Sequence, residues 1–252
     1  MTRGLAITRS RRLQHLEPQP KLRGAALERK PSRKPDVADR LGLWFSKGRY
    51  FDGLWIGTTV YEPEPCLRRV EDALRLIRRH DSLHYSRVIQ NLERVWVHLV
   101  PSYRARYDPS LGACILNERY VLLETTTLEE IACSIVHEAT HARLERCGIS
   151  YEEKERSRIE AVCVRRELNF VAKLPHSESL REEIARTLEW CAGDHDYFSN
   201  VKFQQRNDEG MVEVFRYLGT PDWLIRFIFR MRPVVFAVRR LIRRFAGRRP
   251  QA

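Results

Sequence analysis

One segment of the chain contains the signals for both ends of a helix and two histidines between them, and it constrains the fold more than any other feature. Thr126 and Thr127 stand three residues before a pair of glutamates, the spacing of a capping box, which predicts that a helix begins here. Gly148 predicts its end, because glycine readily adopts the left-handed conformation that stops a helix. Between these signals the sequence reads His137-Glu-Ala-Thr-His141.

The helical period places the polar residues of this motif in distinct positions. His137 and His141 are four residues apart, so their side chains lie one above the other and can reach one Zn²⁺ ion, at about 2 Å from each nitrogen. Glu138 is rotated by about 100° from His137, which places it beside such an ion, where it can accept a proton from bound water. Another sector of the helix is apolar and is predicted to be buried, at Ile131, Ile135, Ala139 and Ala142.

Charge divides the chain into a body and two basic ends. The formal net charge is +12, of which residues 1–40 contribute +7 (eleven Lys and Arg, four acids) and residues 223–252 contribute +9 (nine Arg, no acid), leaving −4 for residues 41–222. We therefore expect a basic, disordered arm over 1–40, a globular domain over 41–222, and a basic amphipathic helix over 223–252. The six cysteines form no CxxC pair and no signal peptide is apparent, so a reducing, cytoplasmic location is expected.

The order of predicted elements favours an α+β fold. Aromatic and β-branched residues predict short strands or loops at 43–61 and a strand at 95–100. Two apolar runs, 113–116 and 120–124, are separated by Asn117-Glu-Arg119 and predict a hairpin. Besides the histidine helix, helices are predicted at about 65–79, 83–92, 152–173, 177–191 and 208–218. A small sheet followed by a mostly helical second half is the expected arrangement.

On this motif and layout, residues 112–171 resemble the zincin metallopeptidases, in which a strand-rich half precedes a helix with the HExxH motif. The metzincin branch would require glycine at 144 and histidine at 147, whereas the chain has Leu144 and Cys147. Cys147 is instead expected to be a buried residue at the end of the helix. The resemblance is therefore to the gluzincin branch, which takes its third metal ligand from a glutamate of the following helix.

That resemblance makes Glu160, 19 residues after His141, the expected third ligand. Glu155 and Glu167 are the alternatives on the same predicted helix, and His176 is a remote one. One zinc ion per chain, held by two imidazoles and one carboxylate, would keep a fourth position for water.

The resemblance also implies a reaction and a way of binding substrate. Zinc-bound water would attack a peptide carbonyl, with Glu138 as the general base. The donor for the developing oxyanion would be His195 or Tyr197. An extended peptide substrate would pair with an edge strand just before the helix, formed by Tyr120, Val121, Leu122, Leu123 and Glu124.

The basic carboxyl end supports a second interpretation. Within residues 223–245, arginines recur every three or four positions beside aromatic and aliphatic residues, which makes a membrane-spanning helix too costly but suits one lying on an anionic membrane surface. The alternative function is therefore a binding or regulatory protein with a zincin-like body. Its basic termini would act at a membrane surface, as a peripheral protein, or on nucleic acid.

Overall fold

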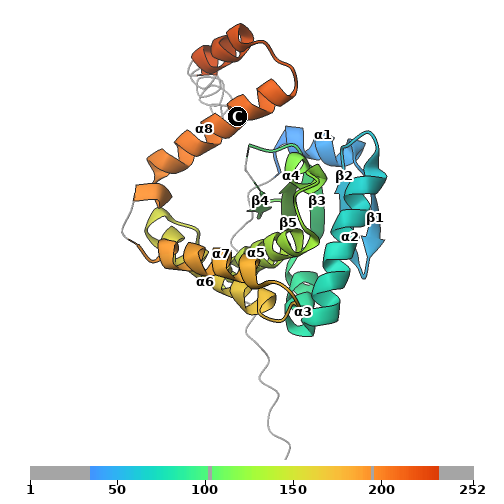
Figure 1. The fold of residues 1–252 in the computed structure, drawn as a ribbon. Coiled ribbons are helices and arrows are strands. Elements are labelled where there is room, and N and C mark those ends of the chain that lie inside the picture. The colour runs from blue at the N-terminus through green and yellow to red at the C-terminus, as the bar shows by residue number, and fades with distance from the viewer. Residues whose placement is uncertain (1–34, 102–103, 194–195, 233–252) are drawn as a thin grey trace, which may run out of the picture.

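A five-stranded mixed sheet organises the first half of the protein. The computed structural model describes residues 35–101, 104–193 and 196–232 (Figure 1). The strand order is β1-β2-β3-β5-β4; β2, β3 and β5 are parallel, and the edge strands β1 and β4 are antiparallel to their neighbours. The strands are β1 (Lys47–Phe51), β2 (Leu54–Thr58), β3 (Arg94–His98), β4 (Ala105–Asp108) and β5 (Ala113–Asn117).

Helices make up most of the remaining described chain, so the predicted α+β class is confirmed. They are α1 (Val37–Phe45), α2 (Pro63–His80), α3 (Ser82–Asn91), α4 (Glu118–Leu122), α5 (Leu128–Arg146), α6 (Arg156–Val171), α7 (Glu178–Cys191) and α8 (Asn200–Tyr217). Two 3₁₀ turns, η1 (Glu153–Glu155) and η2 (Asp196–Phe198), precede α6 and α8, and residues 222–232 are also helical. Among the described helices, none is both long and apolar enough to cross a bilayer.

Helix α5 lies at the centre of the packing. It contacts β4 and β5, its flanks pack against α2 and α3, and it also packs against α6, which in turn carries α7 (Figure 1). The predicted apolar sector of α5 is buried, as are residues of its other faces. Because neighbours surround the helix, most of its polar side chains need partners inside the protein.

The opposite face of the sheet has a smaller core centred on Trp96. Its indole ring is fully buried, and its Nε1 donates a hydrogen bond to Ser46 Oγ at 2.9 Å, just after α1. Val100, Leu111 and Ile115 complete this cluster. The sheet is therefore covered on both faces, which the near-continuous apolar sequence of β5 requires.

The signals that predict α5 act as expected. Thr127 accepts a hydrogen bond from the backbone of Glu130, whose carboxylate accepts one from the backbone of Thr127, so the capping box is complete. Gly148 has φ of +80° just after the helix. The two ends of the helix, and with them the orientation of its histidines, are thus fixed by local interactions.

The predicted hairpin over 113–124 is wrong in its second half. Residues 118–122 form α4, and Asn117 caps that helix by accepting a hydrogen bond from Arg119 N at 3.1 Å. Asn117 therefore begins a helix and does not form a turn between strands. Tyr120 and Val121 are buried, and Leu122, Leu123 and Glu124 lie at or beyond the end of α4, so none of the five forms an edge strand.

Other predicted boundaries differ by smaller amounts. Residues 43–45 belong to α1, which also crosses the predicted domain boundary at residue 40, and α8 begins eight residues before 208. Helices α2, α3 and α7 and strand β3 lie where the sequence predicts them. The arm over 1–34 and the basic segment over 233–252 lie outside the described residues.

Candidate metal centre

Two adjacent helices direct a cluster of polar side chains toward each other. His137 and His141 lie on α5, and Glu160, Cys163 and Glu167 lie on α6. Positions i, i+3 and i+7 share one face of a helix, so the three α6 residues all face α5. We call these five residues, together with Glu138, the candidate metal centre.

Three side chains of this centre bring their ligand atoms as close together as zinc binding would require. His137 Nε2 lies 3.1 Å from His141 Nε2 and 3.1 Å from Glu160 Oε2, and His141 Nε2 lies 3.4 Å from Glu160 Oε1. Ligands at 2.0–2.1 Å from a tetrahedral ion are about 3.3 Å apart. The arrangement therefore fits a divalent ion held by two imidazoles and one carboxylate, and Glu160 occupies the place expected of the third ligand.

Glu167 occupies a different place from Glu160. Its carboxylate forms a hydrogen bond with Nδ1 of His137, on the far side of the ring from the converging nitrogens. In metal sites a carboxylate at this position fixes the tautomer and the orientation of the ligating imidazole. Glu167 thus fits the role of an outer partner that leaves Nε2 free to bind.

The pKa values in the centre reflect an excess of buried negative charge. Burial favours the neutral form of both imidazoles, yet Glu167 and Glu160 raise the pKa of His137 well above its usual value. Cys163 and Glu160 likewise raise the pKa of His141, to about 10. Although burial opposes ionisation, hydrogen bonds from the two imidazoles hold the pKa of Glu160 well below its usual range. The carboxylates of the centre therefore favour positive charge at the two imidazoles, which a divalent ion would also supply.

Glu138 is buried beside this cluster but is not tied to it. Its side chain is only 6% exposed, and among the described residues its carboxylate has no hydrogen-bond partner. Burial raises the pKa of this carboxyl above its usual range, while the two imidazoles act in the opposite direction. An unpaired carboxyl with a raised pKa suits proton transfer better than metal binding.

Tyr151, in the loop between α5 and α6, joins the centre although the sequence gives no sign of it. Its hydroxyl donates a hydrogen bond to Glu160 Oε1, and its ring packs edge-on against His141 with centroids 5.4 Å apart. Burial and Glu160 raise the pKa of Tyr151, so the hydroxyl stays protonated. The path of the loop brings Tyr151 to the centre. A loop has no helical or strand periodicity from which the position of this side chain could be predicted.

The remaining predicted residues lie elsewhere or outside the description. Glu155 pairs with Arg158 at 3.9 Å, and His176 is exposed in the turn after α6. Tyr197 is 40% exposed in η2, where it contacts Trp190 and Arg206. His195 lies outside the described residues.

The prediction that Cys147 is buried is wrong. It is exposed at the carboxyl end of α5, because the helix ends at the surface there. This difference leaves the exclusion of the metzincin pattern unchanged, since that pattern depends on residue identity.

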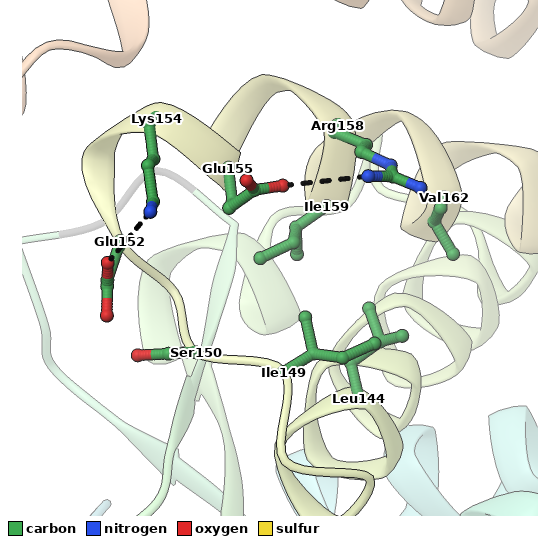
Figure 2. Close-up of a pocket in the computed structure, with 9 residues that line it drawn as sticks. All are labelled: Leu144, Ile149, Ser150, Glu152, Lys154, Glu155, Arg158, Ile159 and Val162. Atoms are coloured by element: carbon green, nitrogen blue, oxygen red, sulfur yellow. Dashed lines mark ion pairs between the residues drawn. The ribbon is translucent and has the colours of Figure 1, made fainter.

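A cavity of about 430 Å³ lies next to the centre, between the end of α5 and the start of α6 (Figure 2). Its apolar walls come from Leu144, Ile149, Ile159 and Val162, and two ion pairs, Lys154–Glu152 and Arg158–Glu155, lie at its rim. None of the residues of the candidate metal centre lines it, so the cavity is a neighbour of the centre and not the centre itself.

Comparison of the chain with protein-family models, with curated proteins and with solved structures finds no match in any of the three. What can be said of the function therefore rests on the geometry and chemistry of the residues described above.

Proposed function

We propose that this protein is a zinc-dependent hydrolase that cleaves peptide bonds, with a site of the gluzincin type. The observation that carries the proposal is the convergence of His137 Nε2 and His141 Nε2, 3.1 Å apart, on the Glu160 carboxylate, whose Oε2 lies 3.1 Å from the first nitrogen and whose Oε1 lies 3.4 Å from the second. These three residues would hold the zinc ion. Bound there, zinc would supply a Lewis acid that makes water more acidic and polarises a carbonyl group.

Residues of the chain would then transfer the proton and orient the metal-binding imidazole. Glu138, with its raised pKa, would accept the proton of the attacking water and pass it to the leaving amine. Glu167 would keep the His137 ring in the orientation that directs Nε2 toward Glu160. Tyr151 replaces His195 and Tyr197 as the proposed hydrogen-bond donor near the reacting carbonyl, and its single hydroxyl proton would turn from Glu160 to the substrate.

Strand β4 takes over the role proposed at first for residues 120–124. It is an edge strand of the sheet, it pairs only with β5 among the described strands, and it packs against α5. An extended peptide can add to such an edge through backbone hydrogen bonds, which orient a substrate without demanding a particular side chain.

The test is Glu138→Gln, compared with wild type in zinc content and in cleavage of a fluorogenic peptide library. Loss of a general base reduces the rate by about 10²–10⁴-fold, while the zinc content should remain at one ion per chain because Glu138 is not a ligand. Glu129→Gln is the matched control, since it makes the same change on the same helix, outside the centre. Full cleavage by Glu138→Gln, or zinc-loaded wild type that cleaves no peptide, would contradict the proposal.

A second candidate function, binding to an anionic membrane surface, is favoured by the helix over 222–232. Trp223, Phe227 and Met231 lie on one face of it and are 67%, 56% and 37% exposed. Arg226 and Arg230 are exposed beside them. Aromatic residues flanked by arginines suit the boundary between headgroups and acyl chains.

Sedimentation with vesicles tests this candidate. The protein should sediment with phosphatidylglycerol vesicles and not with phosphatidylcholine vesicles, and a Trp223→Ala/Phe227→Ala variant should stay in solution. Binding to duplex DNA without binding to either vesicle would favour the nucleic-acid alternative. If the wild type remains in solution with both vesicles, the membrane candidate is wrong.

A further inference from the structure

A fourth donor faces the proposed metal position from α6. Cys163 follows Glu160 by one helical turn, and its Sγ lies within 4.8 Å of a ligand nitrogen of both His137 and His141. The side chain is fully buried. The ligands predicted from the sequence were acids and histidines. The spacing of residues 160, 163 and 167 nevertheless places Cys163 on the same face of α6 as Glu160 and Glu167.

The other buried cysteines of the described chain do not belong to a group of converging ligand atoms, unlike Cys163. Burial raises the pKa of the thiols of Cys66 and Cys191 to about 11, and it raises those of Cys114 and Cys133 as well. Those four behave as small core residues. Cys163 differs because two imidazoles face its sulfur.

Coordination by sulfur would change the type of site. Three protein ligands leave zinc an open position for water, whereas four make the tetrahedral, closed arrangement of structural sites. A thiolate binds zinc at about 2.3 Å, and the sulfur of Cys163 already lies within 4.8 Å of the ligand nitrogens of both histidines.

We propose that Cys163 is a fourth protein ligand of the metal held by His137, His141 and Glu160, so that the resting site is closed and becomes hydrolytic only when the sulfur leaves. This inference rests on the proposed function and adds a regulatory state to it. Binding releases the thiol proton to solvent and changes the oxidation state of neither sulfur nor metal. Displacement of the sulfur by substrate or water opens the position beside Glu138.

The test uses full-length protein loaded with Co²⁺, whose bonds to thiolate give an intense near-ultraviolet charge-transfer absorption. Wild type should show this band, Cys163→Ala should bind cobalt without it, and Cys66→Ala, a matched buried cysteine on α2, should retain it. X-ray absorption of zinc-loaded wild type gives the same answer without a variant, as one sulfur neighbour at about 2.3 Å.

The outcomes separate this inference from the proposed function. Cobalt bound at one ion per chain without a charge-transfer band would overturn the role of Cys163 and leave the hydrolase proposal standing. Wild type that binds neither cobalt nor zinc would overturn both. A closed resting state also predicts that Cys163→Ala cleaves peptides several times faster than wild type, and an unchanged or lower rate would overturn the closed state.

Discussion

The protein contains two clusters of histidine and carboxylate, one partly buried and one buried, and their contrast shows what distinguishes a binding site from a structural network. In the candidate metal centre, three carboxylates meet two imidazoles. In the second cluster, which we call the Asp81 cluster, the Asp81 carboxylate accepts hydrogen bonds from His84 Nδ1 at 2.5 Å and from Lys173 Nζ at 2.8 Å. The centre lies between α5 and α6, whereas the Asp81 cluster lies at the junction of α2 and α3 and includes Lys173, just after α6.

The charges of the Asp81 cluster balance. The Lys173 ammonium balances the Asp81 carboxylate, and burial lowers the pKa of His84, which keeps that ring neutral. Asp81 also caps α3 by accepting a hydrogen bond from His84 N at 3.0 Å. No second imidazole faces His84 in the described chain, so the cluster offers no set of converging ligand atoms.

The candidate metal centre lacks such a partner. Among the described residues, no lysine or arginine pairs with Glu138, Glu160 or Glu167. Glu160 and Glu167 form ion pairs with histidines alone, and Glu138 forms none. Buried carboxylates in this number need positive charge. The comparison therefore distinguishes the two clusters in two ways. The described part of the centre offers no lysine or arginine to balance its carboxylates, and its histidine nitrogens converge, so the centre suits a bound cation.

The largest effect should come from removing the carboxylate ligand. Four-ligand zinc sites in small peptides are worth about 10–16 kcal/mol, or about 2.5–4 kcal/mol per ligand, so loss of Glu160 in Glu160→Ala should weaken zinc binding by about 10²–10³-fold. Competition with a fluorescent chelator measures this affinity. Affinity equal to that of wild type would show that another group, Glu167 or Cys163, is the ligand.

The next effect should appear in stability and not in metal binding. Asp81→Asn should lower the free energy of unfolding by about 2–3 kcal/mol, near the lower end for a broken buried pair because the Lys173 ammonium is half exposed. Urea denaturation measures it, and zinc affinity should not change. If Asp81→Asn lost zinc but kept the stability of wild type, the Asp81 cluster would be the metal site and the contrast would be wrong.

The same variant has a predicted pH dependence. Despite burial, Lys173 and His84 lower the pKa of Asp81 below its usual value, so its contribution to stability is complete above the unfolded pKa of about 3.9 and is lost as the pH falls through the folded pKa. The stability difference between wild type and Asp81→Asn should therefore shrink in acid. A difference that grows in acid would mean that Asp81 is not held ionised.

The smallest effect should come from the outer partner of His137. Removing such a partner costs about 10–100-fold in metal affinity, so Glu167→Gln should bind zinc less tightly than wild type but more tightly than Glu160→Ala. The chelator competition ranks the three proteins. If Glu167→Gln lost zinc as completely as Glu160→Ala, Glu167 would be a ligand itself.

Local sequence signals predicted the central helix well, and they singled out two histidines that the structure places side by side. Thr127 and Gly148 each act on the residues next to them, and His137 and His141 are four residues apart, so the local sequence specifies their geometry. The choice of Glu160 depended on a resemblance to gluzincins, and its carboxylate does lie beside both imidazoles.

Features that depend on distant contacts were not predictable in this way. Residues 120–124 are apolar enough for a strand. They begin in a helix because Asn117 caps it and because Tyr120 packs near Ser134. The placement of β3 between β2 and β5 joins segments far apart in sequence. Tyr151 reaches the centre only through the path of a loop.

The central claim is that the candidate metal centre, and not the Asp81 cluster, binds a divalent ion through its imidazoles. It is tested most directly by the zinc content of purified wild type, His141→Ala and His84→Ala, measured by mass spectrometry after dialysis against zinc-free buffer. We predict one zinc per chain in wild type and His84→Ala, and none in His141→Ala. Zinc retained by His141→Ala, or absent from wild type, would contradict the account.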